Sequence, residues 1–170
     1  SGKTIIDYGC GCGIEALQFA KNGNEIILSD IVPSNVALAT RVLNIFQFRP
    51  KIDTSFDIFY SCGALHHIPE ADMVLRIAVQ SLRDDGEFRL MLYSDKGWEI
   101  STETKAPPIE EEVSTNPRFR KFVRTFDSVG HYADWYSADK LQYRFPFLKL
   151  ERFEYLCSDD AYCAAILRKR

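Results

Sequence analysis

TIIDYGCGCG, residues 4–13, decides the fold of this chain. The first half, Thr4–Tyr8, is a short apolar run rich in β-branched residues, which predicts a buried strand. Three alternating glycines end the run, and apolar residues then recur at intervals of three as far as an Asn-Gly pair, which predicts a helix over residues 13–21. A strand that passes through a glycine loop into a helix is the first half of a strand-helix-strand unit.

The same alternation continues along the chain. Buried strands are predicted at Glu25–Ser29, Phe56–Ser61 and Phe88–Tyr93, and helices over residues 33–44 and at Ala71–Arg83. Strands that alternate with helices of this length form a parallel sheet with right-handed crossovers.

Two further apolar runs, Leu148–Leu156 and Ala161–Leu167, are joined only by CSDD, so they are expected to form an antiparallel hairpin. The predicted fold class is therefore α/β. We expect a Rossmann-like, doubly wound, mostly parallel sheet with helices on both faces and a C-terminal antiparallel hairpin.

Two segments depart from this pattern. Too few residues lie between the helix that ends near Asn44 and the strand at Phe56 to supply a strand and a crossover helix, which needs about a dozen residues. Either the edge strand is truncated here or residues between Phe46 and Asp53 are missing from the given sequence, and the second explanation is favoured. The other segment, residues 95–147, is long and rich in aromatic side chains, which makes it a candidate lid over a substrate.

The 170 residues are 46% hydrophobic and carry 21 basic and 24 acidic side chains, for a formal net charge of −3. A chain of this length can bury one core, so residues 1–170 are expected to form a single domain. No apolar run could span a bilayer, and the slightly acidic balance offers no basic face to nucleic acid. We therefore expect neither membrane insertion nor a nucleic-acid partner. Because the chain begins without methionine in an apolar run, an N-terminal segment is expected to be missing.

The five cysteines are odd in number and form no CxxC pair, which argues against a disulfide framework and against a zinc site. Even Cys10 and Cys12, two residues apart, lie in the glycine loop without a second pair of ligands. A reducing cytoplasm and no bound metal are the expectations; the oligomeric state is left open.

The glycine loop indicates a nucleotide-like ligand. Gly9, Gly11 and Gly13 permit a tight turn, let a ligand approach the backbone and expose the first N–H groups of a helix. Asp30 ends the next strand, where a carboxylate can accept hydrogen bonds from ribose hydroxyls. A dinucleotide fingerprint needs its third glycine at the position of Ile14, so an NAD-dependent oxidoreductase is disfavoured.

Three segments occur in order: DYGCGCG at residues 7–13, the acid Asp30, and SFDIFYSCGALHHIP at residues 55–69. Together they resemble a class I S-adenosylmethionine-dependent methyltransferase of the small-molecule type. The resemblance implies S-adenosylmethionine as the cofactor and methyl transfer to a small-molecule acceptor.

The resemblance also implies a set of cofactor-binding residues. The glycine loop and its preceding acid would surround the methionine portion, the acid that ends the second strand would hold the ribose, and the next residue would lie against the adenine. Residues at the end of the strand before the histidines would approach the sulfonium, and an acid in the shortened region would meet the adenine amino group. The set is Asp7, Gly9, Cys10, Gly11, Gly13, Asp30, Ile31, Asp53, Ser61 and Cys62.

Simpler structural roles compete with two of these assignments. Asp7 could hydrogen-bond the backbone of its own glycine turn, and Asp30 could be only the N-terminal cap of the next helix.

Three histidines are the candidates for a general base, which methyl transfer to a hydroxyl or protonated amine requires. His66 and His67 follow a strand at the carboxyl edge of the sheet, and His131 lies in the candidate lid. All three could face one cleft, although a structural role competes for each of them. Two further functional alternatives stay open: a methyltransferase-like module that binds cofactor or a partner without catalysis, and a methyltransferase that acts on protein or RNA.

Overall fold

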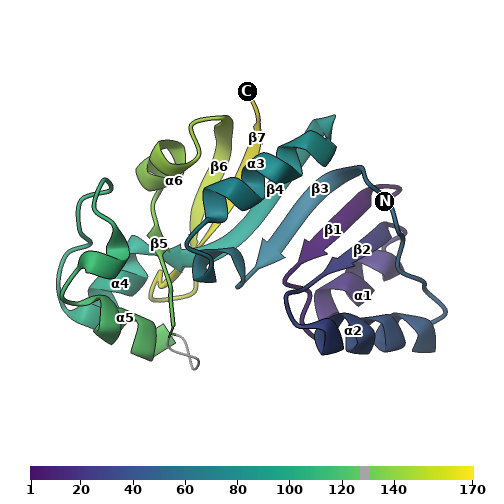
Figure 1. The fold of residues 1–170 in the computed structure, drawn as a ribbon, viewed down its shortest axis with the longest axis horizontal. Helices are drawn as coiled ribbons and strands as arrows, with labels where there is room; N and C mark the ends of the chain where they lie inside the picture. The colour runs from purple at the N-terminus through teal and green to yellow at the C-terminus, as the bar shows by residue number, and fades with distance from the viewer. Residues whose placement is uncertain (127–130) are drawn as a thin grey trace.

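The computed structural model describes residues 1–126 and 131–170. Its centre is a mixed sheet with the strand order β2-β1-β3-β4-β7-β6 (Figure 1). The strands are β1 (Thr4–Tyr8), β2 (Glu25–Ser29), β3 (Phe56–Cys62), β4 (Leu82–Ser94), β6 (Leu148–Leu156) and β7 (Tyr162–Lys169). The strands from β1 to β4 pair in parallel, whereas β7 runs antiparallel to both β4 and β6. The predicted fold class is confirmed, including the terminal hairpin.

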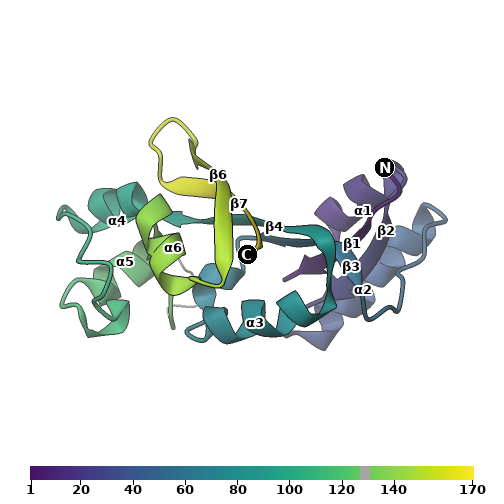
Figure 2. The same ribbon diagram turned by 90° about the horizontal axis from the view of Figure 1, so that it is seen from above.

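Helices cover both faces of the sheet. They are α1 (Ile14–Lys21), α2 (Pro33–Ile45), α3 (Ala71–Ser81), α4 (Asp95–Thr102), α5 (Phe119–Phe126) and α6 (Ala138–Arg144), with short 3₁₀ turns η1 (Leu65–His67) and η2 (Val113–Thr115). In the view of Figure 2, α1 lies on one side of the sheet and α3 and α6 lie on the other.

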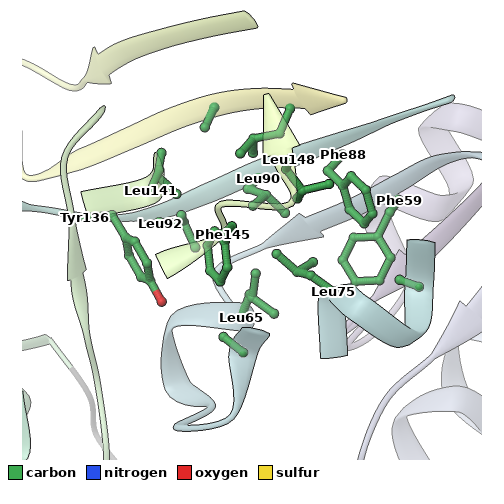
Figure 3. Close-up of a cluster of buried hydrophobic side chains, with 14 of the residues drawn as sticks. Phe59, Leu65, Leu75, Phe88, Leu90, Leu92, Tyr136, Leu141, Phe145 and Leu148 are labelled. Atoms are coloured by element: carbon green, nitrogen blue, oxygen red, sulfur yellow. The ribbon is translucent and has the colours of Figure 1, made fainter. Parts of the chain in front are cut away.

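Alternation along the strands builds these two layers. Ile5 and Ile58 face α1 and α2, while the next residue of each strand, Ile6 or Phe59, faces α3. The larger cluster packs α3, η1 and α6 against the sheet, and at one side of it Phe59 of β3 and Phe88 of β4 lie near Leu75 of α3 (Figure 3). A period of two in the strands therefore yields a core on each side.

The helix predicted at Ala71–Arg83 ends at Ser81, and the following strand begins at once, at Leu82. Gly86, expected just beyond the helix, lies inside β4. Leu82 pairs with Phe56, but the next pair joins Ile58 to Glu87, so the intervening residues of β4 form an irregular bulge. At Leu82 and Arg83, the last two residues of the predicted helix, pairing with β3 outweighs the helical pattern.

The short connection between α2 and β3 crosses the open edge of β2 without forming a strand over residues 46–55. The backbone N–H of Lys51 donates to the carbonyl oxygen of Ile26 at 2.6 Å, which attaches the segment to the sheet edge. The strand expected between α2 and β3 is therefore absent from this segment. Beside it, one face of β1 and β2 borders an apolar groove next to α3, lined among others by Ile6, Ile27 and Ile77.

The candidate lid adds a third layer beyond the carboxyl end of β4. Helices α4 and α5 pack together around Trp98 and Phe122, and the chain returns to the sheet as β5 (Trp135–Tyr136), which pairs with the end of β4 (Figure 1). Residues 127–130 of this segment lie outside the described residues.

Candidate functional site at the carboxyl edge of the sheet

The glycine loop is folded against the end of β2 by its own backbone. The N–H groups of Gly9 and Cys10 both donate to the carbonyl oxygen of Ser29, at 2.7 and 3.0 Å. Gly9, Gly11 and Gly13 have φ values of 80°, 49° and 80°, in the left-handed region that favours glycine. The loop therefore has the tight turn that the sequence predicts.

The glycines of this loop differ in what surrounds them. A Cβ at Gly13 would lie 2.7 Å from the Cβ of Ala39, and one at Gly9 would collide with Ala64. A Cβ at Gly11 would meet nothing within 4 Å. Gly9 and Gly13 thus serve packing within the domain, while Gly11 leaves an open cradle at the surface.

Asp30 ties the end of β2 to this loop. Its Oδ2 accepts the N–H of Gly11 at 2.9 Å, and its Oδ1 accepts the N–H of Val32 at 2.9 Å and the side-chain amide of Asn35 at 3.2 Å. Hydrogen bonds from these donors outweigh burial and lower the pKa of the carboxyl, so the group is a carboxylate at neutral pH. The N-cap residue of α2 is Val32, so Asp30 is not the helix cap that the sequence alternative suggested.

Asp7 is buried under the same loop, with 3% of its surface exposed. Burial raises its pKa to about 7, the negative charge of Glu15 adds to that rise, and a backbone hydrogen bond from Ala16 opposes it. Its Oδ2 has no hydrogen-bond partner among the described residues. A buried carboxyl oxygen without a donor matches a ligand that brings a cation or a donor to this position.

The remaining predicted cofactor contacts lie at the same edge. Ile31 stands beside Asp30 with 97% of its surface exposed, so its side chain is available to a ligand. Cys10 is buried, and burial raises the pKa of its thiol to about 11. Ser61 is fully buried with its hydroxyl unpartnered among the described residues, and Cys62 is partly exposed at the end of β3.

Asp53 lies in the connection that precedes β3. Its carboxylate pairs with Lys51 at 3.1 Å, and that ammonium also binds Glu25 at the amino end of β2. Asp53 also lines the groove beside α3 together with Tyr8 and Ser29, the last residues of β1 and β2. The adenine contact expected for Asp53 stays a prediction.

His66 and His67 form a pair of adjacent rings. Nδ1 of His67 lies 2.9 Å from the carbonyl oxygen of Tyr132, which can only accept, so Nδ1 carries a proton. Nε2 of His66 lies 3.1 Å from Nε2 of His67. Burial lowers the pKa of His66 well below its usual value, and the neighbouring His67 adds to the effect.

Tyr93 joins this pair from the end of β4. Its ring lies 3.8 Å from the ring of His66, and its hydroxyl is 3.5 Å from Nε2 of His67 and donates to the carbonyl oxygen of Phe126 at 2.8 Å. His131, by contrast, is exposed and lines a separate pocket against α5. The structure therefore brings together two of the three predicted histidines.

A buried ion triad holds the returning lid chain against the histidine loop, and sequence reasoning missed it. Asp134, with 1% of its surface exposed, pairs with Lys140 at 2.7 Å and Arg144 at 2.9 Å. Its backbone N–H donates to the carbonyl oxygen of His66 at 2.8 Å, and Arg144 donates to that of Pro69 at 3.1 Å. The sequence shows only that Asp134, Lys140 and Arg144 are spaced around a short helix, and this spacing does not indicate that the three charges are buried.

Two observations bear on the other predicted classes of ligand and partner. Within residues 1–126 and 131–170, no three His, Cys, Asp or Glu side chains are placed to hold one metal ion. None of the helices in the same ranges combines the length and the apolar character needed to cross a bilayer.

The parallel sheet with a reversed terminal strand, the glycine loop and the acid that ends β2 define the class of Rossmann-like S-adenosylmethionine-dependent methyltransferases. The chain belongs to the methyltransferase domain family, whose model matches residues 6–90.

Relatives agree with this assignment. The chain is 25% identical over 99 residues to a ubiquinone biosynthesis O-methyltransferase of Pseudomonas paraeruginosa (strain DSM 24068 / PA7), an alignment of 51% of this chain and 43% of that protein. It is 28% identical over 107 residues to a 27-O-demethylrifamycin SV methyltransferase of Amycolatopsis mediterranei (strain S699), over 53% of this chain and 38% of that protein. The chain thus spans less than half the length of these curated relatives.

The fold matches over nearly the whole chain. The crystal structure of an S-adenosylmethionine-dependent methyltransferase from Mesorhizobium loti superposes with a TM-score of 0.73 at 18% identity, covering 99% of this chain and 92% of that one.

Proposed function

We propose that this domain transfers a methyl group from S-adenosylmethionine to a small-molecule acceptor in the cytoplasm. One observation carries the proposal: the loop that holds the open cradle at Gly11 is bound to the carboxylate of Asp30 and follows the strand that ends beside the buried carboxyl of Asp7, whose Oδ2 has no partner among the described residues. A ligand with a cationic amino acid at one end and a ribose at the other satisfies both acids. The O-methyltransferase names of the two curated relatives favour a small-molecule acceptor.

Different residues of this chain would bind different parts of the cofactor. Asp7 would receive the ammonium of the methionine portion, the loop from Gly9 to Gly13 would follow its backbone, and Asp30 would accept the ribose hydroxyls. Asp30 already accepts three hydrogen bonds, so a two-hydroxyl contact requires the Asn35 amide to move away. Ile31 would cover the adenine, and Ser61 and Cys62 would face the sulfonium.

Bound S-adenosylmethionine supplies an electrophilic methyl group, and the protein must hold the acceptor in line with it and remove the acceptor's proton. His67 is the proton acceptor in this proposal, because the carbonyl oxygen of Tyr132 holds a proton on Nδ1, so Nε2 is the ring atom that would accept one. Nε2 of His66 lies 3.1 Å from that atom, and the acceptor hydroxyl would take its place. The segment at residues 95–147 would close over the acceptor as part of one domain.

Binding of S-adenosylhomocysteine, measured by titration calorimetry, tests the proposal. Asp30→Ala removes charge-assisted hydrogen bonds to the ribose and should weaken binding by about 1–3 kcal/mol, roughly 5- to 150-fold. Asp84→Ala is the matched control, since this acid of β4 is fully exposed and is not among the predicted cofactor contacts, and its affinity should stay within about twofold. Equal affinity of the Asp30 variant and the unchanged protein would remove the ribose assignment.

The other candidate functions predict different results in binding and methylation assays. An NAD-dependent oxidoreductase would bind NAD and would not bind S-adenosylhomocysteine. A non-catalytic module would bind the cofactor tightly and methylate nothing across a broad panel of small molecules, proteins and RNA, whereas a protein or RNA methyltransferase would modify only the macromolecules.

A further inference from the structure

A pocket of about 450 Å³ lies beside α5, and none of its lining residues has a role in the function proposed above. We call it the α5 pocket; its lining is Ser114, Phe119, Arg120, Val123, Arg124 and His131. Phe119 and Val123 belong to the apolar side of the helix and form a nonpolar wall. Arg120, Arg124 and His131 bring hydrogen-bond donors to the same space.

The two arginines, Arg120 and Arg124, lie one helical turn apart on α5. Neither forms an ion pair with another residue of the described part of the chain, whereas their neighbour Lys121 pairs with Glu103 at 2.9 Å. Like charges four residues apart destabilise a helix. Arg120 also stands in the first turn of α5, where the helix dipole disfavours a cation. An anion bound between the two side chains would relieve both costs.

The hydroxyl at the rim contributes less than these cations. Ser114 donates to a carboxylate oxygen of Glu112 at 3.2 Å, so its proton is already engaged. The arginine side chains, with planar forks of N–H donors, therefore set the chemistry of the pocket, and that chemistry is recognition of an oxyanion such as a carboxylate or a phosphate.

The α5 pocket is joined to the histidine pair by two contacts. His131 precedes Tyr132, whose carbonyl oxygen holds Nδ1 of His67 at 2.9 Å. The ring of Phe119 also packs on the ring of Tyr132, with centroids 5.8 Å apart. One residue of the pocket, Phe119, therefore packs on the residue that positions the candidate base, and another, His131, precedes that residue in the chain.

We propose that the α5 pocket binds the oxyanion of the acceptor, so that the enzyme selects acidic small molecules with a nonpolar body. The link to the acceptor rests on the proposed methyltransferase function, whereas anion binding itself does not. Because the arginines are exposed, the binding should weaken as the salt concentration rises.

Titration of the apo protein with benzoate and, separately, with inorganic phosphate tests anion binding without any reaction. The double variant Arg120→Gln/Arg124→Gln should bind the preferred ion at least tenfold more weakly than the unchanged protein. Arg118→Gln is the matched control, because it removes an exposed cation next to α5 that does not line the pocket, and its affinity should be unchanged. The melting temperature of the double variant without anion should equal or exceed that of the unchanged protein, since the repulsion is gone.

The two ions separate the sources of the oxyanion: tighter binding of benzoate assigns a carboxylate, and tighter binding of phosphate assigns a phosphorylated acceptor. In turnover assays, hydroxybenzoates should have at least tenfold higher kcat/KM than their methyl esters if the carboxylate is recognised, and the double variant should abolish that preference. No saturable binding of either ion, or equal binding by the double variant and the Arg118 control, would overturn the proposal. Binding of S-adenosylhomocysteine in the same samples tests the methyltransferase function separately. If this cofactor product does not bind, the titrations with benzoate and phosphate still show whether the α5 pocket binds an anion.

Discussion

At the scale of single residues, Asp7 is the most sensitive probe of the site. Its pKa of about 7 lies above the usual value of 3.8, so the fold favours the neutral form. That contribution to stability is complete below about pH 4 and is lost as the pH rises towards 7. Asp7→Asn removes the buried charge and should raise the melting temperature of the apo protein at pH 8 by several degrees, with a smaller gain at pH 5.

The same carboxyl should make cofactor binding depend on pH. If only the ionised form of Asp7 receives the cofactor ammonium, affinity for S-adenosylhomocysteine falls by up to tenfold for each pH unit below 7. Calorimetry between pH 5.5 and 8 measures this slope, and Asp7→Asn should bind weakly with a flat profile. A sloping profile in the variant would assign the pH dependence to another group.

His67 separates chemistry from binding. His67→Ala removes the proposed proton acceptor and should lower kcat by about 10²- to 10⁴-fold. Affinity for S-adenosylhomocysteine should stay within about twofold, because His66, Tyr93 and Tyr132, which contact its ring, lie outside the glycine loop. If this variant has full activity at saturating acceptor, His67 is not the base, and the rate of methyl transfer depends on the positioning of donor and acceptor alone.

At the scale of elements, the glycine loop shows how one motif serves two purposes. Gly11→Ala adds a methyl group to open space and costs about 1 kcal/mol of left-handed backbone strain, yet it should weaken cofactor binding. Gly13→Ala pushes α1 from α2 at Ala39 and should destabilise the protein by about 2–4 kcal/mol. Urea unfolding and calorimetry on both variants test the difference; equal loss of stability would refute it.

The contact between the lid chain and the histidine loop depends on a buried charge. Asp134→Asn leaves Lys140 and Arg144 without their carboxylate and should destabilise the protein by about 3–5 kcal/mol in urea unfolding. The exposed pair of Arg152 and Glu154 provides the control, and Glu154→Gln should cost at most about 1 kcal/mol. A small effect at Asp134 would mean that α6 is held by its apolar contacts alone.

At the scale of the whole molecule, ligand binding should stabilise the fold as a unit, because the cradle joins β1, β2 and α1. S-adenosylhomocysteine at a hundred times its dissociation constant should add about 2.7 kcal/mol to the free energy of unfolding. For a domain of this size, that corresponds to a rise of roughly 5–10 °C in melting temperature. NAD at the same concentration should produce no shift, and the opposite pattern would reverse the choice of cofactor.

Local patterns by themselves determined the layered fold and the cradle. The buried runs at Thr4–Tyr8 and Glu25–Ser29 match β1 and β2 residue for residue, and the alternating glycines between them adopt the expected positive φ angles. These features depend on short-range periodicity and on backbone conformations that few residues besides glycine adopt readily, so neighbouring residues suffice to predict them.

Only the tertiary structure decided what depends on partners distant in the chain. Pairing with β3 ended α3 at Ser81, Lys51 paired with the carboxylate of Asp53, and the carbonyl oxygen of Tyr132 held a proton on Nδ1 of His67. The burial of Asp134 likewise arises from packing between α6 and the histidine loop. Hydrogen bonds and ion pairs across 60 or more residues, such as that between His67 and Tyr132, exist only after the chain has folded, because no local pattern specifies which segments meet.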